Sequence, residues 1–217
     1  QIVPVFLGRA TGEARDTIER IAVERNATVL RLGRDFEVQG VSPVRFNYAG
    51  SGVRYNDLFC PLLGAHQLDN AACALSLVET ARRHRLAVNE EAIRQGLRNV
   101  QWEGRLEVVG RDPMTILDGA HNPAAAQVLA DHLQRLRVSN PVSRIILVLA
   151  MMRDKDHHGF IEPFKGLVNE VVLTQADLKR SATADELMPI LGYTWPRART
   201  NVDVRGALDD ARQLARP

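Results

Sequence analysis

The chain has 217 residues, of which 45% are hydrophobic and 25% are charged, and these proportions exclude a disordered, collagen-like or coiled-coil protein. Its 28 basic and 26 acidic side chains give a formal net charge of +2, so no overall field recruits nucleic acid or a membrane. The longest strongly apolar run, residues 145–152, is far too short for a membrane span and no signal peptide opens the sequence, so we expect a cytoplasmic protein.

The sequence opens with a predicted strand–helix–strand unit. Residues 1–7 form a strand without any lead-in or initiator Met, so we expect the chain to be a piece of a longer protein. Apolar residues then recur at helical spacing up to about Arg25, and residues 28–32 form a second short strand. Residues 1–32 are therefore expected to form one βαβ unit.

A hairpin and two helices are predicted to complete the first half. Apolar and polar residues alternate at 44–48 and again at 53–58, and the Gly-Ser-Gly segment at 50–52 is typical of a tight turn between them. Asn89 is the expected N-cap of the second helix. The two helices are expected at residues 68–83 and 89–98.

The pattern changes after residues 99–104, which are expected to be a linker. Strands then alternate regularly with helices, which is typical of an α/β domain with a mostly parallel sheet. The expected strands lie at 106–110, 114–118, 144–151 and 169–174, and the expected helices at 123–136, 184–191 and 203–215. The segment Thr183-Ala-Asp-Glu186 predicts a capping box, and Gly192 suits the C′ position of the same helix.

The stretch Leu117-Asp-Gly-Ala-His-Asn-Pro123 carries the strongest chemical signal. A strand is expected to end at Asp118, and a helix begins with Asn122 as its N-cap and Pro123 in the first helical position. A carboxylate at such a strand end suits ribose hydroxyls, while His121 and the free N–H groups of the helix suit phosphate oxygens. The alternative is that Asp118 and His121 only order the loop.

Two further residues are candidates for nucleotide contacts. Arg105 precedes a predicted strand, and pairing of that strand with the next one would bring its cationic side chain toward Asp118, where it would neutralise phosphate charge. Asn70 stands near the start of the helix at 68–83, where an amide can hydrogen-bond a purine edge. The alternatives are that Arg105 is a solvated surface residue and that the segment from His66 to Asn70 only caps the helix at 68–83.

Lys155 lies in the segment Asp154-Lys-Asp-His-His158, directly after the most apolar predicted strand. Because strand ends point to the ligand-binding edge of an α/β sheet, we expect Lys155 to contact an anion, and the alternative is that Arg153 and Lys155 are solvated side chains. Adjacent histidines rarely chelate one ion from such a loop, and Cys60 and Cys73 do not have the spacing of a zinc site. No metal site is therefore expected in the chain.

Several nucleotide-binding and catalytic motifs are absent from the sequence. It contains neither a G-x-x-x-x-G-K-[ST] loop nor a G-x-G-x-x-G fingerprint, and neither G-x-S-x-G nor H-E-x-x-H. If the chain handles ATP, the phosphate-binding loop lies elsewhere. The missing glycine fingerprint also disfavours a dehydrogenase.

Taken together, four stretches resemble the folylpolyglutamate synthase/dihydrofolate synthase family, a branch of the Mur ligase superfamily. They are Leu62–Ala72, Trp102–Val108, Leu117–Pro123 and Met152–Asp156, and they occur in the family's order. The resemblance covers essentially the whole chain, but only the C-terminal half of such an enzyme. It implies that residues 1–100 are the end of a P-loop-type ATPase domain, 101–104 a linker, and 105–217 a Rossmann-like α/β domain with a mostly parallel sheet.

The resemblance also implies a reaction, the ATP-dependent addition of L-glutamate to a carboxylate of a dihydropteroate or folate through an acyl phosphate. In it, Asn70 would contact adenine, Asp118 would bind ribose hydroxyls, and Arg105 and His121 would contact phosphates. His121 and Lys155 would take part in catalysis. The P-loop and the Mg²⁺ ligands would lie upstream of this chain, so the isolated chain would be inactive, and the intact enzyme would be a monomer.

Two other functions stay open on the sequence alone. One is a Mur-type ligase that acts on a nucleotide-sugar peptide, and the other is a stand-alone, non-catalytic nucleotide-binding or interaction module. Acceptor preference separates the first from a folate ligase, and tight ATP binding by this chain alone would favour the second.

Overall fold

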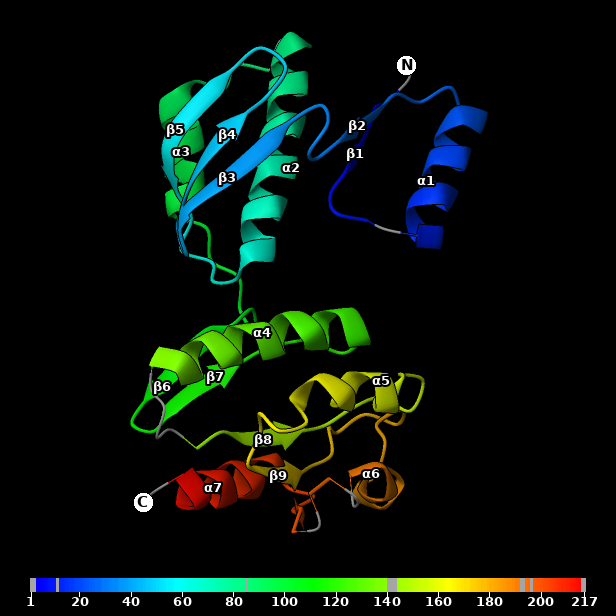
Figure 1. Cartoon of the computed structure of the whole chain (residues 1–217), viewed down its shortest axis with the longest axis vertical. Helices are drawn as coiled ribbons and strands as arrows, with labels where there is room; N and C mark the ends of the chain where they lie inside the picture. The colour runs from blue at the N-terminus through cyan, green and yellow to red at the C-terminus, as the bar shows by residue number, and fades with distance from the viewer. Residues whose placement is uncertain are drawn as a thin grey trace. The chain divides into compact units, whose positions relative to one another are not determined.

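The structure, a computed structural model, describes residues 3–10, 12–84, 86–139, 144–191, 194–195 and 197–215. The chain divides into two compact units, Gln1–Arg105 and Leu106–Pro217 (Figure 1), and each has its own hydrophobic core. Within the described ranges, no helix is long and apolar enough to cross a membrane.

The first unit begins with the expected βαβ arrangement. Strands β1 (Val5–Leu7) and β2 (Val29–Arg31) are parallel, and helix α1 (Gly12–Glu24) connects them. The strand is shorter than the expected range of 1–7, whose first two residues lie outside the described part of the chain. A parallel pair requires a long crossover connection, so a helix between two short apolar segments is a sound basis for predicting this unit.

A three-stranded antiparallel sheet follows, in the order β3-β4-β5. Its strands are β3 (Glu37–Ser42), β4 (Arg45–Ala49) and β5 (Arg54–Phe59). The predicted Gly-Ser-Gly turn joins β4 to β5. Sequence analysis does not predict β3, because five of its six residues are exposed and its side chains do not alternate between apolar and polar.

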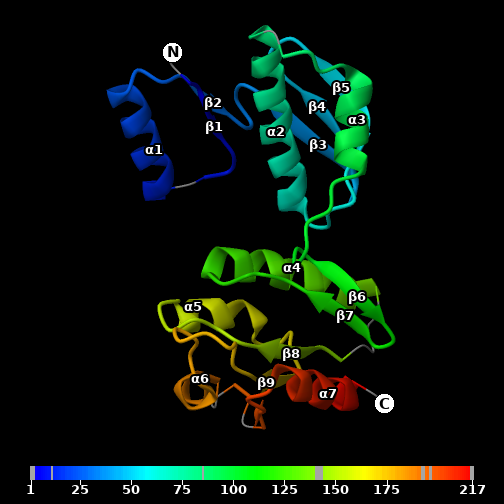
Figure 2. The same cartoon turned by 180° about the vertical axis from the view of Figure 1, so that it is seen from behind.

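Helices α2 (Ala65–Arg83) and α3 (Glu90–Arg98) cover one face of this sheet (Figures 1 and 2). The core between the sheet and the helices includes Phe46, Tyr48 and Leu58 from the strands and Ala72 and Leu75 from α2. The predicted cap of α3 is confirmed, because Asn89 Oδ1 accepts a hydrogen bond from the Ala92 N–H at 2.8 Å.

The start of α2 differs from the prediction. The helix begins at Ala65, three residues early, because Gly64 has a φ of 103° and stands as N-cap without any side-chain capping bond. His66 to Asn70 therefore lie inside the helix, and their interpretation as capping residues is wrong. Gln67 is buried, and it accepts a hydrogen bond through Oε1 from Asn70 Nδ2 at 3.1 Å.

Glu79 fastens the Gly-Ser-Gly turn to α2. Its carboxylate accepts hydrogen bonds from the Gly52 N–H at 2.8 Å, from the Tyr48 hydroxyl at 3.2 Å and from Arg83 Nη2 at 3.0 Å. These three donors satisfy a carboxylate that is buried in the core of the unit. A Cβ atom on Gly50 would overlap the same carboxylate, so only glycine fits at that position.

The second unit contains a parallel sheet in the order β10-β9-β8, as expected for an α/β domain. Its strands are β8 (Ile146–Leu149), β9 (Glu170–Leu173) and β10 (Arg199–Thr200). Val171 and Leu173 face the core formed with helices α4 (Pro123–Ser139), α5 (His157–Ile161) and α6 (Ala184–Leu191). Val172 faces α7 (Val204–Ala215), which packs on the other side of the sheet (Figure 1).

Three short elements of this unit escape sequence analysis. They are α5, the 3₁₀ helix η1 (Glu162–Phe164) and the two-residue strand β10. Each has five residues or fewer, so the apolar pattern does not repeat often enough to give a periodic signal. The capping box at Thr183 and Glu186 is confirmed, whereas Gly192, its expected C′ residue, lies outside the described residues.

Strands β6 (Glu107–Arg111) and β7 (Met114–Leu117) form an antiparallel hairpin of their own. Asp118 therefore follows a hairpin strand, and the interpretation that it stands at the end of a strand of the parallel sheet is corrected. The reason is the connection, because two residues between the strands can close only a hairpin, whereas parallel pairing requires a crossover of a dozen residues or more.

Candidate functional site

Asp118 ties together the two ends of the β6–β7 hairpin. Its Oδ2 accepts a hydrogen bond from the Leu106 N–H at 2.8 Å, and its Oδ1 accepts one from the Ala120 N–H at 2.9 Å. Leu106 is buried and has a φ of 50°, a backbone conformation that a non-glycine residue adopts only when its surroundings enforce it. Asp118 therefore orders its loop, and each of its oxygens retains a lone pair for a ligand.

His121 and Asn122 lie in the turn from Asp118 into α4. The predicted N-cap is confirmed, since Asn122 Oδ1 accepts a hydrogen bond from the Ala125 N–H at 2.9 Å. His121 is exposed, and its Nδ1 lies 2.9 Å from the carbonyl oxygen of Gly119. Because a carbonyl can only accept, Nδ1 carries the proton, and Nε2 is the ring nitrogen that a ligand can meet.

Lys155 stands where the sequence places it, in the loop that leaves the C-terminal end of β8. Its side chain is 29% exposed, and its Nζ lies 3.3 Å from Asp154 Oδ2. A hydrogen bond from Lys155 lowers the pKa of the Asp154 carboxyl. Asp156 is the N-cap of α5, and its Oδ1 accepts a hydrogen bond from the Gly159 N–H at 2.9 Å. The loop is thus a short ordered segment with a cation half-buried in it.

The Asp118–Pro123 loop and the Lys155 loop meet at the first turns of α4 and α5, which lie side by side in Figures 1 and 2. A Cβ atom built on Gly159 would lie 2.7 Å from Pro123 Cγ and would also overlap Asp156 Oδ2. Only glycine allows this approach. Sequence analysis misses the contact, because a glycine inside a short unpredicted helix gives no sign of the element that packs against it.

The five predicted site residues are divided between the two compact units. Asp118, His121 and Lys155 belong to the second unit, where their loops adjoin. Asn70 and Arg105 belong to the first unit, and both are exposed. Arg105 is the residue before Leu106, so its backbone adjoins the amide that Asp118 holds. Among the described residues, no group of three or more His, Cys, Asp or Glu side chains gathers in the manner of a metal site.

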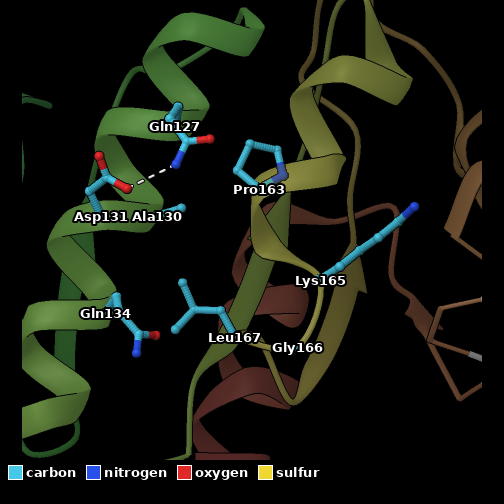
Figure 3. Close-up of a pocket in the computed structure, with 8 residues that line it drawn as sticks. All are labelled: Gln127, Ala130, Asp131, Gln134, Pro163, Lys165, Gly166 and Leu167. Carbon is cyan, nitrogen blue, oxygen red and sulfur yellow. Dashed lines mark hydrogen bonds between the residues drawn. The ribbon is translucent and has the colours of Figure 1, made fainter.

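A cavity of about 290 Å³ lies elsewhere in the second unit, between α4 and the turn after η1. It is lined by Gln127, Ala130, Asp131, Gln134, Pro163, Lys165, Gly166 and Leu167. Figure 3 shows Gln127 donating to Asp131, at 2.8 Å, while the Lys165 side chain points away from α4. None of the predicted site residues lines this cavity, so it is not part of the candidate site.

The chain is similar to known ligases over nearly its whole length. A family model described as "Mur ligase, glutamate ligase domain" matches residues 104–217. A probable bifunctional folylpolyglutamate synthase/dihydropteroate synthase from Haloferax volcanii is 34% identical, and the match covers 99% of this chain and 25% of that protein.

Solved structures give the same result. Mycobacterium tuberculosis folylpolyglutamate synthase complexed with ADP is 29% identical, with a TM-score of 0.85 over 98% of this chain and 47% of that one. The bifunctional folylpolyglutamate synthase/dihydrofolate synthase of Yersinia pestis, complexed with AMPPNP and Mn ion, is 29% identical, with a TM-score of 0.77 over 91% of this chain and 44% of that one. The chain thus spans between a quarter and about half of the length of these relatives. It belongs to the Mur ligase family, in the branch of the folylpolyglutamate and dihydrofolate synthases, and residues 104–217 match the glutamate ligase domain of that family.

Proposed function

We propose that this chain is the C-terminal part of an ATP-dependent ligase that joins L-glutamate to a carboxylate of a dihydropteroate or folate. The observation that carries the proposal is the meeting of the Asp118–Pro123 loop with the Lys155 loop at the first turns of α4 and α5. This arrangement gathers a carboxylate, an imidazole and an ammonium in the unit that matches a glutamate ligase domain. The names of the relatives supply the substrate class.

The proposal assigns residues 1–100 to the end of a P-loop-type ATPase domain, 101–104 to a linker and 105–217 to the glutamate ligase domain. Two observations support the division. The compact units separate between Arg105 and Leu106, and the family match begins at residue 104. The P-loop and the ligands of the Mg²⁺ that accompanies ATP are assigned to residues outside this chain, in a cytoplasmic and monomeric enzyme.

The described residues fit the groups of ATP. Asp118 retains acceptor capacity for ribose hydroxyls, and the exposed His121 ring, when it carries a proton on Nε2 as well, can donate to a phosphate oxygen. Arg105 is exposed and suits phosphate through its planar guanidinium, and the Asn70 amide, on the surface of α2, suits the edge of adenine. Lys155 would contact an anionic group of the substrates, which makes it, with His121, a candidate catalytic residue.

In the proposed reaction, the acceptor carboxylate attacks the γ-phosphorus of ATP, an acyl phosphate forms and ADP leaves. The amino group of L-glutamate then attacks the acyl carbon, the C–O bond to phosphate breaks, and inorganic phosphate leaves together with the proton of the amine. Positive groups such as Arg105 and Lys155 would offset the charge that develops on the transferring phosphoryl group. Exclusion of water would protect the acyl phosphate from hydrolysis.

The test uses the full-length enzyme with ATP and L-glutamate, and phosphate release is measured with dihydropteroate, with folate and with a nucleotide-sugar peptide as acceptors. We expect release with a pteridine acceptor only. Arg105→Ala and His121→Ala should each lower kcat/KM by about 100-fold, the size of a lost charge-stabilising contact, while Arg111→Ala at the far end of β6 should change nothing. Turnover of the peptide, or near-normal activity of both site variants, contradicts the proposal.

ATP binding separates this proposal from a stand-alone nucleotide-binding module. Because the chain lacks a G-x-x-x-x-G-K-[ST] loop, we expect this 217-residue chain by itself to bind ATP only at millimolar concentration in a calorimetric titration. Micromolar binding would favour the module.

A further inference from the structure

The loop that carries Lys155 is tied to a distant helix by one arginine. Arg153 Nε donates to Glu186 Oε1 at 2.9 Å and to Oε2 at 3.1 Å, and Arg153 Nη1 donates to the carbonyl oxygen of Lys179 at 2.9 Å. Glu186 stands in the first turn of α6, 33 residues along the chain. The guanidinium therefore connects the loop after β8 with both the loop after β9 and the start of α6.

Glu186 is itself fixed in place. Its Oε2 accepts a hydrogen bond from the Thr183 N–H at 2.7 Å, and its own N–H donates to Thr183 Oγ1 at 3.3 Å, which completes the capping box. The hydrogen bond from Arg153, followed by that from the Thr183 backbone, lowers the pKa of Glu186 to about 2. The carboxylate is therefore ionised at any pH used to assay the protein.

The backbone of the two loops is paired beside this contact. The Arg153 N–H donates to the carbonyl oxygen of Arg180 at 2.9 Å, and the Ala182 N–H donates to that of Met151 at 2.8 Å. On the far side of Lys155, His157 Nε2 donates to the Met152 carbonyl oxygen at 2.9 Å. Lys155 thus stands in a segment that is held at both ends, with the Arg153 side chain forming the anchor on the α6 side.

Folding stability does not account for this arrangement. The side chains of Arg153 and Glu186 are 48% and 46% exposed, and half-exposed ion pairs add little to stability because water and salt screen them. A capping box would also serve α6 equally well with glutamine in place of glutamate. Three hydrogen bonds leave the Arg153 guanidinium few orientations. The charged pair therefore fixes the direction of the loop that follows Arg153.

We propose that Arg153 and Glu186 are positioning residues, which hold the loop after β8 so that the ammonium of Lys155 meets a carboxylate or phosphoryl group of the substrates. The inference rests on the proposed function, because it takes Lys155 as the anion contact. It predicts that the pair acts only through Lys155.

The test is a double-mutant cycle in the full-length enzyme with Glu186→Gln and Lys155→Ala. Glutamine retains the hydrogen bond to the Thr183 N–H but loses the charge that holds Arg153. We expect Glu186→Gln to lower kcat/KM about tenfold with an unchanged Tm, to raise KM for the same substrate as Lys155→Ala does, and to cost less than about twofold when Lys155 is already alanine. A rise in KM for L-glutamate identifies a carboxylate, and a rise in KM for ATP identifies a phosphoryl group.

Two further variants serve as controls. Asp185→Asn removes a charge from the neighbouring exposed position of α6 and should leave both KM values unchanged. Arg153→Lys keeps the charge but loses the planar contact, so it should fall between the wild type and Glu186→Gln.

The outcomes separate the inference from the function it rests on. Additive losses in the cycle, or a Glu186→Gln variant that loses activity together with Tm, show a structural role and overturn the inference. Normal activity of Glu186→Gln beside a strongly impaired Lys155→Ala overturns it while the role of Lys155 stands. Normal activity of Lys155→Ala removes the inference and the role of Lys155 together, and Arg105→Ala then decides whether the rest of the proposed function survives.

Discussion

The carboxylate of Asp118 holds the backbone N–H of Leu106 at 2.8 Å, across the two strands of the β6–β7 hairpin. This hydrogen bond fixes a buried leucine whose φ of 50° belongs to the left-handed region, and it lies one residue after Arg105. Asp118 therefore has a structural role, as an acceptor of backbone hydrogen bonds, and, as we propose, a second role in binding the nucleotide.

Asp118→Asn should impair both the stability of the hairpin and the proposed binding of the nucleotide. The amide can accept one of the two backbone hydrogen bonds, but it presents an NH₂ group to the other N–H, which leaves a buried donor unpaired. We expect a loss of about 1–3 kcal/mol in unfolding free energy together with a fall in kcat/KM. Thermal unfolding and steady-state kinetics of the full-length enzyme measure the two effects. Asp131→Asn, an exposed carboxylate on α4, is the control, and a stable Asp118→Asn variant would contradict the structural role.

Gly50→Ala should destabilise the first unit by about 1–3 kcal/mol, because the new methyl group overlaps the buried Glu79 carboxylate. Gly96→Ala provides the matched control, since the position is inside α3 and a Cβ there would meet nothing within 4 Å apart from its chain neighbours and the backbone of its own helix. Replacing a helical glycine by alanine should raise stability by about 0.5–1 kcal/mol. Thermal unfolding of both variants gives the comparison, and equal Tm values would show that the turn adapts to the methyl group.

Stability at high pH should depend on Tyr48. Burial, and after it the charge of Glu79, raises the pKa of the Tyr48 hydroxyl above its ordinary value of 10.0. The folded state therefore keeps the proton more tightly than the unfolded state. This contribution to stability is fully present below pH 10 and is lost as the pH rises further. Tm should fall less steeply above pH 10 in Tyr48→Phe than in the wild type, and parallel curves would contradict the assignment.

Gly159→Ala should lower activity without unfolding the protein. The methyl group would meet Pro123 Cγ and Asp156 Oδ2, so the first turns of α4 and α5 must separate. We expect kcat/KM to fall about tenfold, as displaced site residues lose productive geometry, while Tm changes by only a few degrees. Unchanged kinetics would show that the meeting of the two loops has no bearing on catalysis.

Local chemistry made much of this molecule predictable from sequence. Asn122 caps α4 and Glu186 completes a capping box because each interaction spans only three residues, so the spacing in the sequence is the geometry in the fold. Strands β8 and β9, which pair in parallel, were predictable as apolar runs, although the short helix α5 between them was not. Lys155 lies two residues after the start of the turn that follows β8, and its place could be predicted from the end of that strand alone.

Contacts between distant segments were not predictable in this way. Arg153 reaches Glu186 over 33 residues, and Pro123 packs against Gly159 over 36, and no periodic pattern records either pairing. Asp118 was predicted to bind a ligand from the edge of a parallel sheet, and the short Asp112-Pro113 connection was the overlooked evidence for a hairpin. The type and spacing of residues thus identified the candidate chemistry. Which of these side chains lie on adjoining loops was decided by tertiary packing.

The hydrogen bond between Asp118 and Leu106 also marks where the second unit begins. The Leu106 amide is held by a residue of that unit, so the φ of Leu106 is fixed as part of the hairpin. Two residues earlier, Gly104 has a φ of 65° that only glycine adopts easily. An insertion ahead of Gly104 should therefore leave the β6–β7 hairpin intact, whereas an insertion directly after Leu106 would deform it.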